Sequence, residues 1–165
     1  MSKTAPRLYL NIPGVLLAPE PPFAQTTEFM GSRYVPEVVK RLGETGMELA
    51  WLTGLPAETV HAVETELGMH GRIIPHMVPD HHSYRWKLLA LARDIRLRPV
   101  PFVWVDTGIR RDHREWAEQR LRVPQWHIHP FALRGLTDLS LRVIESFAQT
   151  YSGDDPNPSS LQSHP

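Results

Sequence analysis

Hydrophobic and polar positions fall into blocks along the chain, and the blocks switch between strand and helix periods. Short apolar runs, typical of buried strands, occur at Leu8–Leu10, Glu48–Leu52 and Val100–Val105. Two weaker strands are predicted at Arg72–His76 and Trp126–His129. Between the strands, apolar residues recur every three or four positions, which predicts amphipathic helices. These helices cover Val35 to Gly43 or Gly46, Pro56–Leu67, Ser83–Arg96, Arg111–Arg122 and Thr137–Tyr151.

Strands that alternate with helices predict a parallel sheet with right-handed crossovers and helices on both faces. We therefore expect a three-layer, Rossmann-like α/β sandwich. A chain of 165 residues has room for one such domain, which we place at residues 1–150. Residues 151–165 are rich in Ser, Pro and Asp and are predicted to form a disordered tail.

Polar residues follow three of the predicted strands directly. Asn11 follows the first strand, Thr53 the second and Asp106 the longest one. In open α/β sheets, ligands bind outside the carboxyl ends of the strands. The pattern therefore predicts one site at this edge of the sheet.

Composition narrows the classes of function. Lys plus Arg and Asp plus Glu both total 18, and no basic stripe is visible, which argues against nucleic-acid binding through phosphate neutralisation. No apolar run is long enough to span a membrane, and the polar start at Met1–Arg7 does not suggest a signal peptide. The chain has no cysteine, which excludes disulfides and thiolate chemistry and favours the cytoplasm.

The strand ends and one lysine resemble, in order and spacing, the four motifs of the haloacid dehalogenase (HAD) superfamily. The first motif, a strand followed by Asp-x-Asp, is matched by Leu8–Leu16, and the second, a strand ending in Ser or Thr, by Trp51–Gly54. The third, a lysine near a helix start, is matched by Tyr84–Lys87, and the fourth, an apolar strand ending in acids, by Phe102–Thr107.

The resemblance covers roughly Leu8 to Ala148. It is closest to the small, capless, actinobacterial-type members, which also carry a Gly-Leu-Thr like Gly135–Thr137 before the last helix. It implies a HAD-like core with no sizeable cap.

The resemblance implies the following roles. In active members the first Asp attacks phosphorus, and the second Asp acts as general acid and base. The motif-four acids hold magnesium with the nucleophile, and Thr and Lys orient the phosphoryl group. In this chain Thr53, Lys87 and Asp106 match those positions. Three others do not: Asn11 replaces the nucleophile, Pro13 the acid/base, and Thr107 the second motif-four acid.

These replacements remove the chemistry of aspartyl-phosphate formation. A neutral carboxamide is a poor nucleophile, and proline has no group to titrate, whereas general acid–base help is worth about 100- to 10,000-fold. Pro13 could still offer its carbonyl and Asn11 its amide oxygen to magnesium, but such sites usually rely on one or two carboxylates. Lys87 can also pair with Asp106 and leave the pocket neutral without a cation. We therefore expect no cofactor, and magnesium binding that is lost or weak.

Six residues are predicted to contact a ligand: Asn11, Thr53, Gly54, Lys87, Asp106 and Thr107. Asp106, Lys87 and Asn11 are the candidates for catalysis. Thr53 could instead cap the following turn, and Lys87 could be a solvated surface lysine. Asp106 follows an apolar strand, and buried acids need partners, so it is the strongest candidate.

The histidines do not follow a zinc-binding spacing, and no metal site is predicted from them. We interpret His70, His76, His81, His82, His127 and His129 as surface and loop residues. In the alternative interpretation, His81 or His82 reaches the site as a replacement acid/base. Trp51, Trp86 and Trp104 lie in or beside predicted elements and are expected in the core.

Two classes of function compete. The first is a non-hydrolytic pseudophosphatase that binds a small anionic molecule or a partner at the Thr53 and Lys87 site. The second is a repurposed, metal-independent enzyme that performs cyclisation, isomerisation or dehydration on an anionic or carbonyl-bearing molecule, as in specialised metabolism. Loss of the other acids favours the first, whereas retention of Asp106 gives weight to the second. Residual phosphohydrolase activity ranks third.

Overall fold

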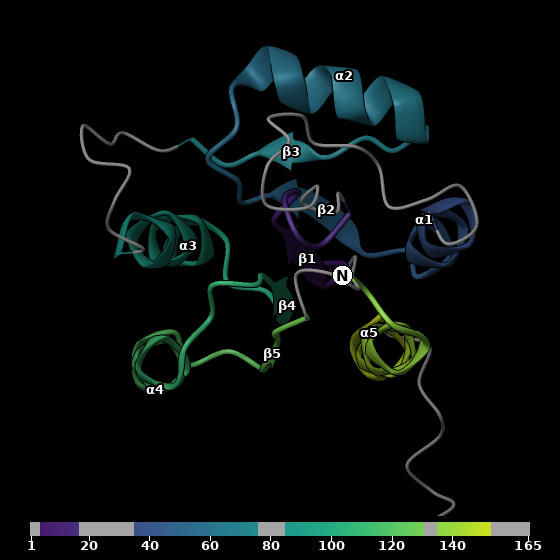
Figure 1. Cartoon of the computed structure of the whole chain (residues 1–165). Helices are drawn as coiled ribbons and strands as arrows, with labels where there is room; N and C mark the ends of the chain where they lie inside the picture. The colour runs from purple at the N-terminus through teal and green to yellow at the C-terminus, as the bar shows by residue number, and fades with distance from the viewer. Residues whose placement is uncertain (1–3, 17–34, 76–84, 131–134, 153–165) are drawn as a thin grey trace, which may run out of the picture.

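Strands and helices alternate along the described part of the chain (Figure 1). The computed structural model describes residues 4–16, 35–75, 85–130 and 135–152. The strands are β1 (Arg7–Leu10), β2 (Glu48–Trp51), β3 (Arg72–Ile73), β4 (Phe102–Val105) and β5 (Gln125–Ile128). The helices are α1 (Val35–Glu44), α2 (Ala57–Leu67), α3 (Arg85–Leu97), α4 (Arg111–Arg120) and α5 (Asp138–Tyr151).

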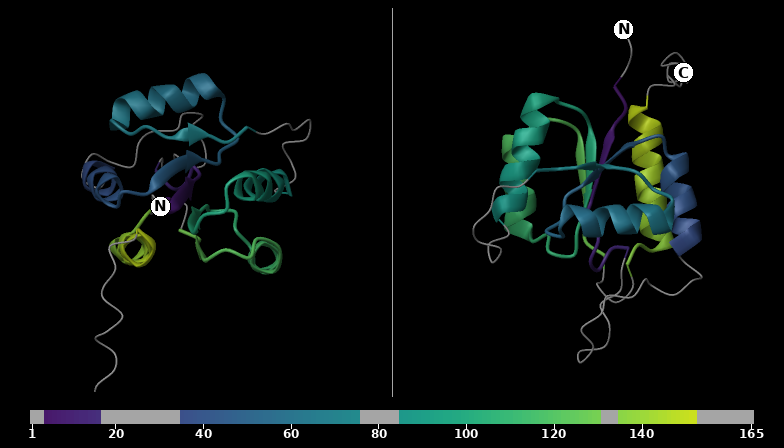
Figure 2. Two further views of the ribbon diagram at one scale, coloured as in Figure 1. Left: turned by 180° about the vertical axis from the view of Figure 1, so that it is seen from behind. Right: turned by 90° about the horizontal axis from the view of Figure 1, so that it is seen from above.

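The strands form one sheet in the order β3-β2-β1-β4-β5, and every pair is parallel. Helices α3 and α4 lie on one face of the sheet, and α1 and α5 on the other, with α2 packed beside α1 (Figure 2). The predicted three-layer α/β sandwich is therefore confirmed. No helix among the described residues is long and apolar enough to cross a membrane.

Side chains of the central strands point alternately to the two faces. Leu8 and Leu10 of β1 pack in the core beneath α1 and α5, whereas Tyr9 packs in the core beneath α3 and α4. All four residues of β1 and of β4 are buried, which explains why Val103–Val105 belongs to a nearly continuous apolar run. Edge strand β5 is partly exposed, and its Trp126 is about half exposed.

Several predicted boundaries are wrong by one or more residues. Strand β4 begins at Phe102 rather than Val100, because Pro101 has no N–H for the ladder. Helix α4 ends at Arg120 rather than Arg122, whose φ of 24° is not helical. Strand β3 is a two-residue edge strand rather than a strand running to His76, and β5 begins and ends one residue earlier than predicted.

The domain boundary also needs a correction. Helix α5 continues through Tyr151, whose ring contacts that of Phe147 at 4.6 Å between centroids, so Tyr151 belongs to the domain rather than to the tail. The tail beyond Ser152, the predicted loop at 18–33, and His76, His81 and His82 lie outside the described residues. The absence of a cap stays a prediction, because the segments 17–34 and 76–84 are not described.

Two of the three predicted core tryptophans, Trp51 and Trp104, are fully buried, and Trp86 is half-buried against the core. His70 and His129 are exposed, as predicted. The prediction is wrong for His127, which lies within β5. Its ring packs edge-on against the rings of Phe102 and Trp104, and burial, aided by the charge of Arg114, lowers its pKa to about 4.

Gly71 allows the turn before β3 to pack directly on β2. A Cβ at this position would lie 2.8 Å from Leu49 Cγ and 2.8 Å from Trp51 Nε1, and the Gly71 N–H donates to Glu64. Gly71→Ala is therefore expected to lower the free energy of unfolding by about 1–3 kcal/mol through overpacking. Urea denaturation measures the change.

Gly43→Ala is the matched control for this substitution. Gly43 lies in helix α1, and a Cβ there would meet nothing within 4 Å. At an exposed helix position, alanine should stabilise the protein by about 0.5–1 kcal/mol relative to glycine. Equal effects of the two substitutions would contradict the close packing at Gly71.

Candidate functional site

The polar residues predicted at the strand ends lie at the same edge of the sheet. The Asn11 N–H donates to Val105 O at 3.0 Å, and the Asp106 N–H donates to Ile128 O at 3.1 Å. These bonds continue the parallel ladder one residue beyond β1 and β4, so Asn11 and Asp106 stand next to each other. The Leu52 N–H donates to Leu10 O at 2.9 Å, which places the following residue, Thr53, on the other side of Asn11.

Lys87 and Asp106 form a buried ion pair at the centre of this edge. Lys87 is the third residue of α3, and its Nζ lies 2.5 Å from Asp106 Oδ2. Only 8% of the Lys87 side chain and 1% of the Asp106 side chain are exposed. The pairing predicted from the sequence is therefore confirmed, and the alternative of a solvated surface lysine is wrong.

Asn11 completes a three-residue contact. Its Nδ2 donates to Asp106 Oδ1 at 3.4 Å and to Pro13 O at 3.3 Å. The Gly108 N–H donates to the same Asp106 oxygen at 2.9 Å. Both oxygens of Asp106 thus accept hydrogen bonds, as a buried carboxylate requires.

The other predicted ligand-binding residues surround this contact. Thr53 is buried, and its Oγ1 accepts a hydrogen bond from the Leu55 N–H at 3.4 Å, which is the turn-capping role considered for it. A Cβ at Gly54 would lie 3.7 Å from Trp86, so the start of α3 lies against this turn. Thr107 is half-buried in the turn after Asp106.

Burial changes the acidity of the lysine. Removal of the ammonium from water lowers the pKa of Lys87, although the charge and hydrogen bond of Asp106 oppose that change. The group therefore releases its proton more readily than an ordinary lysine. A buried amine beside a buried carboxylate can hold an anion or exchange a proton with a ligand.

The residues do not fit the magnesium ion that active HAD phosphatases use. Among the described residues, Asp106 is the one carboxylate in the contact, and the Lys87 ammonium lies where a cation would neutralise it. Asn11 turns its amide nitrogen toward Asp106 and Pro13, both of which are acceptors. Within the part of the chain that the structure describes, no three His, Cys, Asp or Glu side chains are grouped as metal ligands would be.

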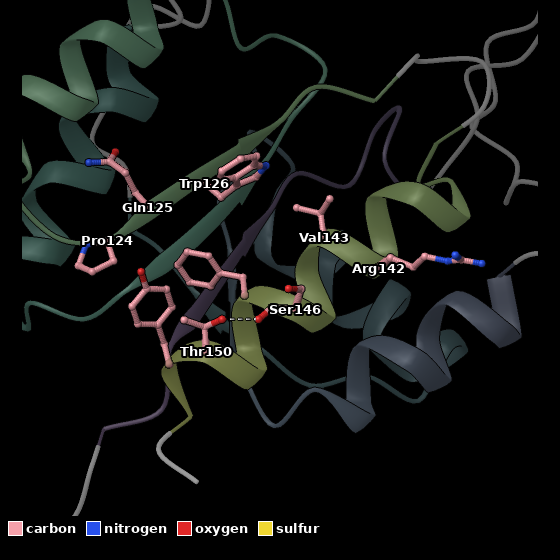
Figure 3. Close-up of a pocket in the computed structure, with 9 residues that line it drawn as sticks. Pro124, Gln125, Trp126, Arg142, Val143, Ser146 and Thr150 are labelled. Atoms are coloured by element: carbon pink, nitrogen blue, oxygen red, sulfur yellow. Dashed lines mark hydrogen bonds between the residues drawn. The ribbon is translucent and has the colours of Figure 1, made fainter. Parts of the chain in front are cut away.

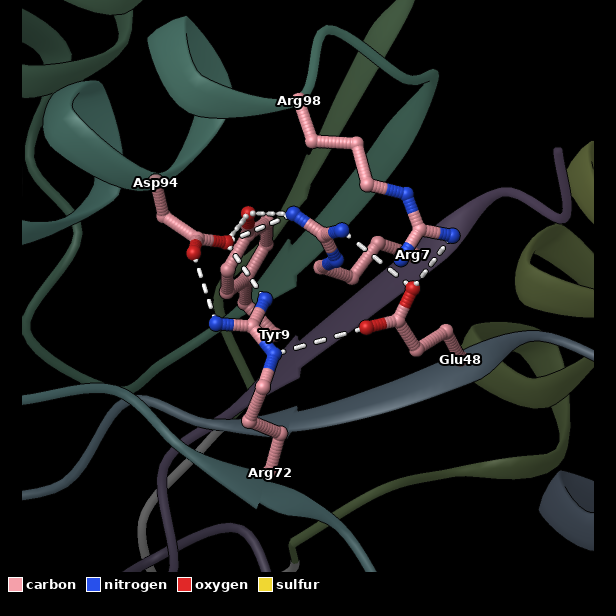
Figure 4. A network of polar contacts seen from close by, with 6 residues as sticks. All are labelled: Arg7, Tyr9, Glu48, Arg72, Asp94 and Arg98. Atoms are coloured by element: carbon pink, nitrogen blue, oxygen red, sulfur yellow. Dashed lines mark hydrogen bonds and ion pairs between the residues drawn. The ribbon is translucent and has the colours of Figure 1, made fainter.

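Sequence reasoning missed a second polar cluster beneath α3, in which Arg7, Tyr9 and Asp94 are buried. We name it the Asp94 network; it comprises Arg7, Tyr9, Glu48, Arg72, Asp94 and Arg98 (Figure 4). Arg7 was expected in a polar N-terminal segment, but it is the first residue of β1 and is buried. No sequence pattern could signal this, because Arg7 and its partner Asp94 are 87 residues apart.

A groove of about 600 Å³ lies away from the strand ends, between β5 and α5 (Figure 3). Apolar side chains form most of its lining, among them Trp126, Val143, Phe147 and Tyr151. None of the six residues predicted to contact a ligand lines this groove. The predicted site and the groove are therefore separate features.

No family model matches the chain, and no curated protein sequence is significantly similar to it. Among solved structures, the chain is similar to 3-deoxy-D-manno-octulosonate 8-phosphate phosphatase from Yersinia pestis, at 11% identity and a TM-score of 0.47, over 90% of this chain and 82% of that one. It is also similar to a protein from Legionella pneumophila assigned as a HAD superfamily (subfamily III A) hydrolase, at 14% identity and a TM-score of 0.48, over 92% and 85%. These likenesses say nothing of activity. The chain has the parallel, three-layer α/β architecture that its alternating strands and helices predicted.

Proposed function

We propose that this chain is a HAD-like protein that binds a small anionic molecule at the carboxyl ends of β1, β2 and β4 and does not hydrolyse phosphate esters. The observation that carries the proposal is the buried pair of Lys87 and Asp106, in contact with Asn11 where a phosphatase has its nucleophile. A neutral amide cannot supply the attacking carboxylate, and Pro13 cannot protonate a leaving group.

The chemistry of the site also suggests how strongly it binds. Lys87 supplies a buried positive charge, and the Thr53 hydroxyl can donate a hydrogen bond. Asp106 already neutralises the lysine, so the attraction for an anion is weaker than at an unpaired ammonium. We therefore expect affinities near the millimolar range for a simple anion, and tighter binding for a ligand that makes further contacts.

Inorganic phosphate should therefore stabilise the folded protein. At about ten times its dissociation constant, phosphate should add about 1.4 kcal/mol of stability, which raises the melting temperature by about 3–5 °C for a chain of this length. Lys87→Met should abolish this rise. Differential scanning fluorimetry in matched ionic strength measures it.

Lys40→Met is the matched control, because Lys40 is an exposed lysine on α1, which lies on the other face of the sheet from α3. It should leave the phosphate-induced rise unchanged. A rise that persists in Lys87→Met would show that phosphate binds elsewhere and would refute the proposed site. Magnesium-dependent turnover of an aryl phosphate that Asn11→Ala abolishes would refute the non-hydrolytic assignment.

One observation favours a second candidate function, a metal-independent enzyme that acts on a small carbonyl-bearing molecule. Burial lowers the pKa of Lys87, and its ammonium lies 2.5 Å from the Asp106 carboxylate. This pair could relay a proton in an isomerisation, dehydration or cyclisation. An ordinary lysine pKa for Lys87, measured by NMR, would remove the support for this candidate. His81 and His82 stay predictions as alternative acid/base groups.

The absence of cysteine is compatible with a cytoplasmic location for either function. A partner protein at the same strand ends remains part of the proposal, since the anionic group recognised by Lys87 could belong to a small molecule or to a side chain of a partner.

A further inference from the structure

Helix α3 carries two buried charges that both face the sheet. Lys87 and Asp94 are seven residues apart, which is about 10.5 Å along the helix axis and within about 20° of the same face. Lys87 pairs with Asp106 at the end of β4, whereas Asp94 pairs with Arg7 at the start of β1. Two ion pairs of opposite polarity therefore tie the helix itself to the sheet, and Arg98, which directly follows α3, adds a contact to Glu48 of β2.

The contacts of Asp94 come from two different strands. Its Oδ2 accepts hydrogen bonds from Arg7 Nη1 at 2.6 Å and from Tyr9 Oη at 2.5 Å, both on β1. Arg72 of β3 binds it in bidentate fashion, with Nη1 at 2.7 Å from Oδ1 and Nη2 at 2.9 Å from Oδ2. Burial by itself raises the pKa of Asp94, but the hydrogen bonds from Arg72 and Tyr9, together with the charges of Arg7 and Arg72, hold that pKa below its usual range.

Apolar packing alone does not fix a helix along its axis to the same degree. Leu88, Leu91 and Ile95 of α3 pack against apolar side chains of the sheet, and such contacts have no preferred direction. Hydrogen bonds require both a distance and an angle, and the bidentate pair with Arg72 adds geometric specificity. The Asp94 contacts thus restrict sliding and rotation of α3.

We propose that Asp94 is a positioning residue, which through Arg7, Tyr9 and Arg72 fixes helix α3 along the sheet so that Lys87 meets Asp106. The positioning role matters for binding only if the proposed function holds, since Lys87 is the group that receives the anion. It goes beyond that function because it assigns a role to the Asp94 network, which lies at the opposite ends of the strands.

A pair of half-exposed arginines allows a matched test. Arg72 and Arg98 both contact Glu48, but Arg72 also holds Asp94. Arg72→Met therefore weakens the Asp94 contacts, whereas Arg98→Met removes a similar charge from the same network and leaves those contacts in place. Asp94→Asn is the direct variant, but it leaves the buried Arg7 short of one carboxylate and could fail to fold, so the arginine pair decides the question.

Lysine NMR provides a readout that a merely structural role would not change. The chain contains three lysines, Lys3, Lys40 and Lys87, so the signals of protein labelled with ¹³C at lysine Cε can be assigned with Lys87→Arg. In Arg72→Met we expect the pKa of Lys87 to move by about half a pH unit or more, because its burial and its distance from Asp106 change. We also expect the affinity for inorganic phosphate to fall about threefold or more, since about 1 Å of misplacement impairs a site.

Arg98→Met should leave both the lysine titration and the phosphate affinity at their values in the unmodified protein. If Arg72→Met and Arg98→Met give the same Lys87 titration, the positioning role of Asp94 is wrong. If the unmodified protein does not bind phosphate, the proposed function fails, but the Lys87 titration still decides whether Asp94 positions the helix.

Discussion

Asp106→Ala is expected to lower the free energy of unfolding by about 3–5 kcal/mol, because it leaves the Lys87 ammonium buried without its carboxylate. It also removes the acceptor of the Asn11 and Gly108 hydrogen bonds. Urea denaturation at pH 7 measures the loss. The double variant with Asp106→Ala and Lys87→Met should recover part of the lost free energy of unfolding, because no buried charge is then left without its partner.

The pH dependence of the stability of Asp106→Ala follows from the pKa of Lys87. The pKa of Lys87 is already lowered by burial in the unmodified protein, and loss of Asp106 removes the group that opposes that change. Between the lowered folded pKa and the ordinary unfolded one, the unfolded chain binds more protons, so stability rises with pH. The cost of Asp106→Ala should therefore shrink at alkaline pH, and a cost that is constant across that range would contradict a buried, charged Lys87.

Asn11→Asp is expected to create a magnesium dependence that the unmodified protein lacks. The new carboxylate would take the place of a donor that lies 3.4 Å from Asp106 Oδ1, so two negative charges would share one lysine. Without metal, the lost hydrogen bond and the like charges should cost about 1–3 kcal/mol of stability. Magnesium should restore it, and titration calorimetry should show specific binding only in the variant.

Asn11→Ala is the control for this substitution, because it also loses the hydrogen bond but adds no charge. It should be destabilised without recovery by magnesium. The Asn11→Asp variant should still not turn over an aryl phosphate, since Pro13 supplies no acid. Micromolar magnesium binding by the unmodified protein would contradict the neutral pocket formed by Lys87 and Asp106.

The strands that matter most were predictable from the sequence for a physical reason. Strands β1 and β4 are covered on both faces, so nearly all of their side chains must be apolar. Each strand therefore appears in the sequence as an apolar run that ends where the polar strand-end residues begin. Edge strands carry a weaker signal. Strand β3 has two residues, and half-exposed β5 includes His127, which the pattern could not distinguish from a loop histidine.

The polar contacts also include a part that the sequence predicted and a part that it did not. Asn11, Lys87 and Asp106 were predicted to lie together because motif spacing and parallel topology both place them at one edge, and the pairing of Lys87 with Asp106 follows from their charges. The Asp94 network was not predictable. An arginine before a strand and an aspartate late in a helix are individually ordinary, and only the packing of α3 on β1 shows that they meet.

The central place of β1 has a consequence for how the site is assembled during synthesis. Asn11 and Asp106 touch, yet they are 95 residues apart along the chain, and one edge of β1 stays without its neighbour until β4 has been made. Contacts of such long sequence separation form slowly, because loop closure must precede them. Lys87 precedes Asp106 by 19 residues, so a nascent chain carries the lysine before the acid that neutralises it. The proposed ligand-binding edge is therefore completed late, when β4 docks against a strand that left the ribosome much earlier.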